Sequence, residues 1–153
     1  MTTRFLIFDD NSHVRTMLSL FLKQQGYDVL GFDSPLSCDL LAQQSCSCPR
    51  STACADAMVT AMNMPRMSGP ELIRFQQKRG CHLPIKNIAI GSSRLREDQK
   101  DQLKTLGCSF LSKPFNFNQI STWAKSCQAR VTPHRTLVPL EELWKTVVKA
   151  AFH

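Results

Sequence analysis

The sequence predicts an α/β fold in which five parallel strands form one sheet and helices cover both of its faces. Short apolar runs alternate with longer segments whose apolar residues recur every three or four positions, and glycine or proline stands at most of the boundaries. Parallel strands need a crossover connection, usually a helix, so this alternation is typical of a parallel sheet. A chain of 153 residues is long enough for one domain with a sizeable core.

The first strand and the first helix are predicted at the start of the chain. Arg4–Phe8 is a short apolar run, which indicates a buried strand. Ser12 is suited to cap a helix over about residues 13–25, and Gly26 is suited to end it. The apolar side of this helix is predicted to consist of Val14, Met17, Leu18, Phe21 and Leu22.

A second strand and helix are predicted over residues 27–44. Tyr27–Phe32 carries the aromatic and aliphatic residues of a strand. Pro35 suits the first turn of a helix that continues to about Gln44. Residues 46–55 are rich in Cys, Ser and Thr, so we expect them to form a loop.

The third and fourth strand–helix pairs follow the same pattern. Ala57–Met62 is predicted as the third strand, and Ser68 and Glu71 fit a capping box at the start of the next helix. The apolar run Ile85–Ile90 is predicted as the fourth strand. The charged segment of about residues 96–106 is predicted as a helix, because a glycine follows it and is suited to end it.

The fifth strand–helix pair is followed by an additional segment. Ser109–Ser112 is predicted as the fifth strand, and Asn116 or Asn118 begins a helix that continues to about residue 129. Residues 130–138 are predicted to be a linker, and residues 139–151 a last amphipathic helix. The apolar face of that helix is predicted to consist of Leu140, Leu143, Trp144, Val147, Val148 and Ala151.

The composition excludes several classes of protein. Apolar residues make up 42% of the chain, which argues against disorder, and no apolar run approaches the roughly 20 residues of a transmembrane helix. The N-terminus lacks the cleavage region of a signal peptide, so we expect a cytoplasmic protein without a membrane partner. The net charge of +7 is spread along the chain, which favours a solvated basic surface over a nucleic-acid interface.

Polar residues follow the predicted strands at the edge where the carboxyl ends of parallel strands meet. The first strand is followed by Asp9 and Asp10, the fourth ends near Ser92, and the fifth leads to Lys113. Adjacent carboxylates suit magnesium, and a lysine with a serine hydroxyl could hold a phosphoryl oxygen. The combination at one edge is more specific than any of these residues alone.

Three segments of the sequence resemble the receiver domain of two-component response regulators. They are FLIFDDNSHVRTML at 5–18, MNMPRMSGPELI at 62–73 and GCSFLSKPF at 107–115. The resemblance extends from residue 4 to about 128 and implies a flavodoxin-like sheet in the order 2-1-3-4-5. We therefore expect a receiver-like domain over residues 1–129, followed by a linker and C-terminal helix over residues 130–153.

The resemblance places Ala61 where the family has its phosphate-accepting aspartate, three residues before the Met-Pro of the third loop. Alanine has no side-chain oxygen to phosphorylate or to offer to a metal. Asp56 cannot substitute, because five residues of strand at roughly 3.3 Å each place it about 16 Å away, at the other end. The resemblance therefore implies a pseudo-receiver, a degenerate domain without the phosphoacceptor.

The other pocket positions match the family in part. The matching residues are the acidic pair, the lysine and the switch aromatic, namely Asp9, Asp10, Lys113 and Phe110. The hydroxyl position of the family falls on Gly91, with Ser92 next to it as the alternative, and Lys113–Pro114 is a candidate cis peptide bond. Two interpretations of the acidic pair stay open: a residual ion-pair cluster, or a weak magnesium site.

Seven cysteines are many for a cytosolic chain, and a reducing compartment argues against disulfide bonds. Cys46, Cys48, Cys54 and Cys81 lie in two loops that the implied strand order brings together at the N-terminal edge of the sheet. Four thiolates would suit zinc or an iron–sulfur cluster, although paired Cys-x-x-Cys spacing is lacking; reduced loop thiols are the alternative. The other cysteines are expected to be packing residues: Cys38, Cys108 and Cys127.

The sequence thus favours a phosphorylation-independent signalling module that binds a protein partner, either a histidine kinase or another regulator. By resemblance, the docking surface would lie within about residues 96–128. The alternative is a metal-binding or redox-sensing regulator that uses the cysteine loops. No nucleophile–base pair suggests an enzyme, and the sequence leaves open whether the protein is a monomer or a homodimer.

Overall fold

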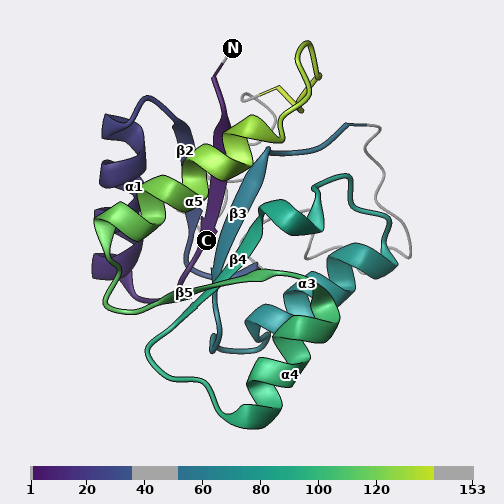
Figure 1. Ribbon diagram of the computed structural model, residues 1–153. Helices are drawn as coiled ribbons and strands as arrows, with labels where there is room; N and C mark the ends of the chain where they lie inside the picture. The colour runs from purple at the N-terminus through teal and green to yellow at the C-terminus, as the bar shows by residue number, and fades with distance from the viewer. Residues whose placement is uncertain (1, 36–51, 140–153) are drawn as a thin grey trace.

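The computed structural model of the chain describes residues 2–35 and 52–139 (Figure 1). Five parallel strands form one sheet in the order β2-β1-β3-β4-β5, which confirms the predicted flavodoxin-like topology. The strands are β1 (Arg4–Phe8), β2 (Asp28–Phe32), β3 (Ala57–Ala61), β4 (Ile88–Ser92) and β5 (Ser109–Ser112).

Helices cover both faces of the sheet (Figure 1). Within the described ranges, α1 (Ser12–Gln24) and α5 (Phe117–Ala129) lie on one face, and α3 (Gly69–Lys78) and α4 (Glu97–Leu106) lie on the other. None of the helices in these ranges is long and apolar enough to cross a membrane. The helices predicted over residues 35–44 and 139–151 fall almost entirely outside the described residues.

Alternate side chains of each strand pack into two separate cores. In β1, Phe5 packs with Leu18 and Ile120 beneath α1 and α5, whereas Leu6 packs with Leu72 beneath α3. This division follows from the period of two in a strand, which directs successive side chains to opposite faces. Burying one such side chain stabilises the fold by about 1.5–3 kcal/mol, so both faces contribute to stability.

The start of α1 differs from the prediction by one residue. The side chain of Asn11, not Ser12, caps the helix, because its Oδ1 accepts hydrogen bonds from the backbone amides of His13 and Val14 at 3.0 and 3.1 Å. The predicted apolar side was also too wide. Leu18 and Leu22 are buried, but Met17 is 40% exposed and lies at the solvent side of the helix.

The fourth strand begins later than predicted. Ile85–Asn87 forms a 3-10 turn after Pro84, and β4 begins only at Ile88. The side chain of Asn87 explains the turn, because its Nδ2 donates to the backbone oxygen of Asp56 at 2.9 Å and so fixes the strand entrance. The shift places Ser92 inside β4 and pairs Gly91 with Ala61 across the sheet.

The segment after α5 packs against the domain. We call residues 131–139 the C-terminal strap. Val138 is only 3% exposed, its amide donates to the backbone oxygen of Ala53 at 3.0 Å, and Leu137 forms a parallel bridge with Ala53. Arg4 Nη1 donates to the backbone oxygen of Val138 at 2.6 Å. The predicted linker is therefore held against the N-terminal edge of the sheet.

Candidate functional site

The predicted acidic pair divides between the interior and the surface. The side chain of Asp9 is only 5% exposed, whereas Asp10 is exposed to solvent. Both oxygens of Asp9 are engaged, because Oδ2 lies 2.7 Å from Lys113 Nζ and Oδ1 accepts the amide of Asn11 at 3.0 Å. A buried carboxylate needs such partners, since burying an unpaired charge is costly.

Lys113 reaches Asp9 from the turn between β5 and α5. Its backbone amide donates to the backbone oxygen of Ser92 at 2.9 Å, and the Lys113–Pro114 peptide bond is cis, as the resemblance implied. The ammonium also lies 5.9 Å from the centroid of the Phe115 ring, within the range of a cation–π interaction. The lysine is thus positioned by contacts within the chain itself.

Ala61 ends β3 at this same edge of the sheet. Its side chain is buried, and it lines a small depression of about 110 Å³ together with Gly91 and Lys113. The backbone around it is tightly packed, because a Cβ placed on Gly69 would lie 2.5 Å from the Ala61 carbonyl oxygen. The first turn of α3 can therefore approach the strand end only with glycine at this position.

The two candidates for the hydroxyl position, Gly91 and Ser92, are the last two residues of β4. Gly91 pairs with Ala61, and a Cβ placed on Gly91 would lie 2.8 Å from Phe115 Cζ. Phe115 thus fills the space that a side chain at position 91 would need. Ser92 does carry a hydroxyl, but its Oγ donates to the backbone oxygen of Arg94 at 2.9 Å and so serves a local turn.

The side chains at this edge fit magnesium poorly. Both oxygens of Asp9 already accept hydrogen bonds, and Ala61 contributes no oxygen. Asp10 remains as an exposed carboxylate, whereas magnesium requires near-octahedral oxygen ligation. In residues 2–35 and 52–139, no group of three or more His, Cys, Asp or Glu side chains is arranged to hold a metal ion.

Phe110, the predicted switch aromatic, lies on β5, which is an edge strand of the sheet. Its side chain is 39% exposed, which is unusual for a large aromatic residue in a strand. It therefore lies within the surface formed by α4, β5 and α5. This position falls within the docking surface of about residues 96–128 that the sequence predicted.

The cysteines fall into two groups. Cys54 and Cys81 are half-buried and pack against the core beneath α3, while Cys46 and Cys48 lie outside the described residues, so the four-thiolate hypothesis stays a prediction. The packing role expected for Cys108 and Cys127 is confirmed by their place against the two cores; Cys38 is not described. Burial raises the pKa of Cys127 to about 12 and that of Cys108 to about 11.

Asp56 lies at the opposite end of β3, as the sequence predicted. Its carboxylate accepts the amide of Arg4 at 2.9 Å and two hydrogen bonds from Arg135, one of them from Nε at 2.8 Å. The carboxylate also raises the pKa of Arg135 through this hydrogen bonding. The role of Arg135 was not predictable from the sequence, because 79 positions separate it from Asp56 and no local pattern connects them.

Comparisons with known proteins agree on one family. The profile of the response regulator receiver domain matches residues 5–125. Response regulator MprA of Mycolicibacterium vanbaalenii is 28% identical over 137 residues, covering 87% of this chain and 53% of that protein. The alkaline phosphatase synthesis transcriptional regulatory protein SphR of Synechococcus elongatus is 23% identical over 119 residues, 77% of this chain and 46% of that protein.

Solved structures show the same fold. A response regulator receiver protein from Pseudomonas putida superposes with a TM-score of 0.66 at 25% identity, covering 82% of this chain and 98% of that one. The chemotaxis protein CheY4 of Vibrio cholerae gives a TM-score of 0.64 at 24% identity, covering 83% of this chain and 99% of that one. The chain spans about half the length of the curated relatives that it matches.

Proposed function

The chain belongs to the response regulator receiver domain family, and we propose that it signals without aspartyl phosphorylation, by presenting a fixed receiver surface to a protein partner. Receiver domains are signalling modules of two-component systems rather than enzymes, so the class of function follows from the family. The mode of signalling is the proposal. The proposed partner is a histidine kinase or another regulator.

The observation that carries this proposal is the methyl group of Ala61 at the end of β3. A phosphoryl group can be accepted only by a side chain with a nucleophilic oxygen, and alanine has none. Asp9 has a buried carboxylate at the same edge of the sheet. Its two oxygens already accept hydrogen bonds from Lys113 and from the Asn11 amide. Phosphorylating Asp9 would require breaking the 2.7 Å ion pair with Lys113.

The surroundings of Ala61 support a fixed state rather than a switch. The charge of Lys113 is balanced by Asp9, and Phe115 occupies the space above Gly91. No bound phosphate is needed to hold the lysine in place. The surface of α4, β5 and α5, with the exposed ring of Phe110, is therefore proposed to be competent for partner binding as it stands.

A comparison of amide NMR spectra tests this proposal. The wild-type protein and Ala61→Asp are each recorded with magnesium, before and after addition of acetyl phosphate. We expect the resonances of α4, β5 and α5 to stay unchanged in the wild type, because it has no phosphate-accepting oxygen at position 61. Movement of these resonances in the wild type, at the same positions as in Ala61→Asp, would contradict the proposal.

A further inference from the structure

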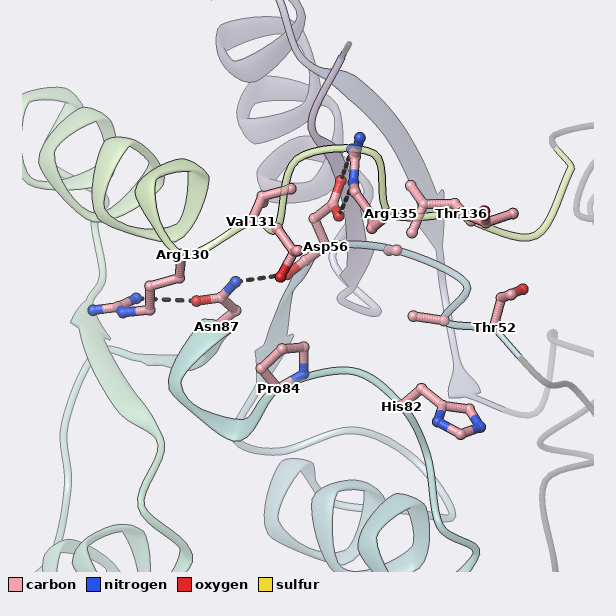
Figure 2. A pocket seen from close by; sticks show the side chains of 13 residues that line it. Thr52, Asp56, His82, Pro84, Asn87, Arg130, Val131, Arg135 and Thr136 are labelled. Atoms are coloured by element: carbon pink, nitrogen blue, oxygen red, sulfur yellow. Dashed lines mark hydrogen bonds and ion pairs between the residues drawn. The ribbon is translucent and has the colours of Figure 1, made fainter.

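A hollow of about 440 Å³ lies at the edge of the sheet opposite Ala61 (Figure 2). Three separate segments form its walls, namely residues 52–56 before β3, residues 82–87 before β4 and residues 130–137 after α5. Cavities of this volume are typical of sites for small organic molecules. The hollow shares no lining residue with the depression at Ala61.

Hydrogen bonds connect the three walls to one another. Arg130 Nη1 donates to Asn87 Oδ1 at 3.0 Å, Asn87 Nδ2 donates to the backbone oxygen of Asp56 at 2.9 Å, and Arg135 is bound to the Asp56 carboxylate (Figure 2). A parallel β-bridge between Ala53 and Leu137 joins the first wall to the third. The walls are thus fixed before any ligand arrives, which reduces the entropic cost of binding.

The charges around the hollow favour an anion. Two guanidinium groups line it, those of Arg130 and Arg135, against one carboxylate, that of Asp56. The charges of Arg135 and Asp56 offset each other in their ion pair, so the net positive charge of the lining comes from Arg130. The guanidinium of Arg4 donates to the backbone oxygens of Cys54 and Val138 beside the hollow and adds a further positive charge.

Arg130 is the cation best placed to contact a ligand. It is exposed at the rim, and its hydrogen bonds to Asn87 and to the backbone oxygen of Lys86 use Nη1 alone. The side chain also forms a hydrogen bond with the Cys127 thiol, and a guanidinium carries five N–H donors in all. The remaining N–H groups can form charge-assisted hydrogen bonds to an anionic group at the rim.

The other residues that line the hollow suit the apolar part of a ligand. Pro84, Val131 and Leu137 provide apolar surface, and the hydroxyls of Thr52 and Thr136 add polar groups. We propose that the hollow is a binding site for a small organic anion, a phosphate ester with an apolar ring, whose ring lies on Pro84 and Val131 while Arg130 binds the phosphate. The site is independent of the signalling mode proposed above.

Titration with phenyl phosphate, followed by amide NMR, tests the site. We expect the resonances of residues 52–56, 82–87 and 130–137 to shift. Inorganic phosphate and phenol should each bind more weakly than phenyl phosphate, because the first lacks the apolar ring and the second lacks the phosphate. Arg130→Gln should weaken phenyl phosphate binding about tenfold, the effect of losing one charge-assisted hydrogen bond. Thr136→Trp should block binding by filling the hollow, whereas Thr105→Trp on α4 is the matched control.

Three results would overturn the proposal. The first is the absence of any shift at millimolar phenyl phosphate. The second is a set of shifts confined to Ala61, Gly91 and Lys113 at the other edge of the sheet. The third is unchanged affinity in Arg130→Gln, a surface substitution that tests the site even where Thr136→Trp does not fold.

Discussion

Lys113 and Asp9 form an ion pair across the carboxyl edge of the sheet, with Nζ 2.7 Å from Oδ2. The carboxylate is almost fully buried, and the lysine side chain is 22% exposed. Lys113 also lines the depression that contains Ala61. The pair is therefore complete without a third charged group, and this relationship underlies the first prediction.

Lys113→Met should lower the free energy of unfolding by about 2–4 kcal/mol, because it leaves the buried Asp9 carboxylate without its cation. Adding Asp9→Asn to this variant should recover most of the loss. Lys100→Met is the matched control, since its pair with Glu97 is exposed and should contribute no more than about 0.5 kcal/mol. Urea denaturation measures all four proteins, and equal losses for Lys113→Met and Lys100→Met would contradict the prediction.

Asp56→Asn should lower the free energy of unfolding by about 3 kcal/mol, because the carboxylate holds both the Arg4 amide and Arg135 in a buried position. The same substitution at Asp98, whose pair with Arg96 is exposed on both sides, should change stability much less, because solvent screens that pair. Urea denaturation compares them. A small effect at Asp56 would mean that the C-terminal strap is not held by Arg135.

Gly91→Thr should lower the free energy of unfolding by about 1–3 kcal/mol, because its Cβ would meet Phe115 Cζ at 2.8 Å. Phe115→Leu should relieve part of this clash in the double variant, so the two effects should not add. A double-mutant cycle by chemical denaturation measures the coupling. Additive effects would show that Phe115 does not fill the space above Gly91.

Cys127 should make stability fall at alkaline pH. Burial raises the pKa of its thiol from 9.0 to about 12, so between these values the folded state keeps a proton that the unfolded chain releases. This contribution to stability is fully present below about pH 9 and is lost as pH rises towards about 12. Cys127→Ala should therefore show a shallower decline in melting temperature above pH 9 than the wild type, and parallel curves would contradict the assignment.

The parts of the fold that depend on local pattern were predictable from the sequence. The bounds of β1 and β5 match the prediction, and the strand order is the one that the family resemblance implied. The start of β4 was not predictable in this way. Ile85 continues an apolar run, but the turn is set by Asn87, whose partner Asp56 is 31 positions away.

The candidate site was predictable where family positions are fixed by sequence spacing. Asp9, Ala61 and Lys113 were all expected at one edge, and the structure brings them there. The pairing of Gly91 with Ala61 was not predictable, because the strand register depends on contacts between distant segments; the match of Gly91 or Ser92 to the hydroxyl position stays a prediction. Contacts of the C-terminal strap were missed for the same reason, since nothing near Val138 in the sequence indicates that it is buried.

Incubation of the purified chain with acetyl phosphate and magnesium, followed by intact mass spectrometry, tests the central claim most directly. Ala61→Asp serves as the matched comparison, since it restores a carboxylate at the end of β3. The wild-type mass should stay unchanged, because Ala61 has no oxygen to accept the phosphoryl group and Asp9 is held by Lys113. A wild-type mass increased by one phosphoryl group, mapped to Asp9 or Asp10, would contradict the account.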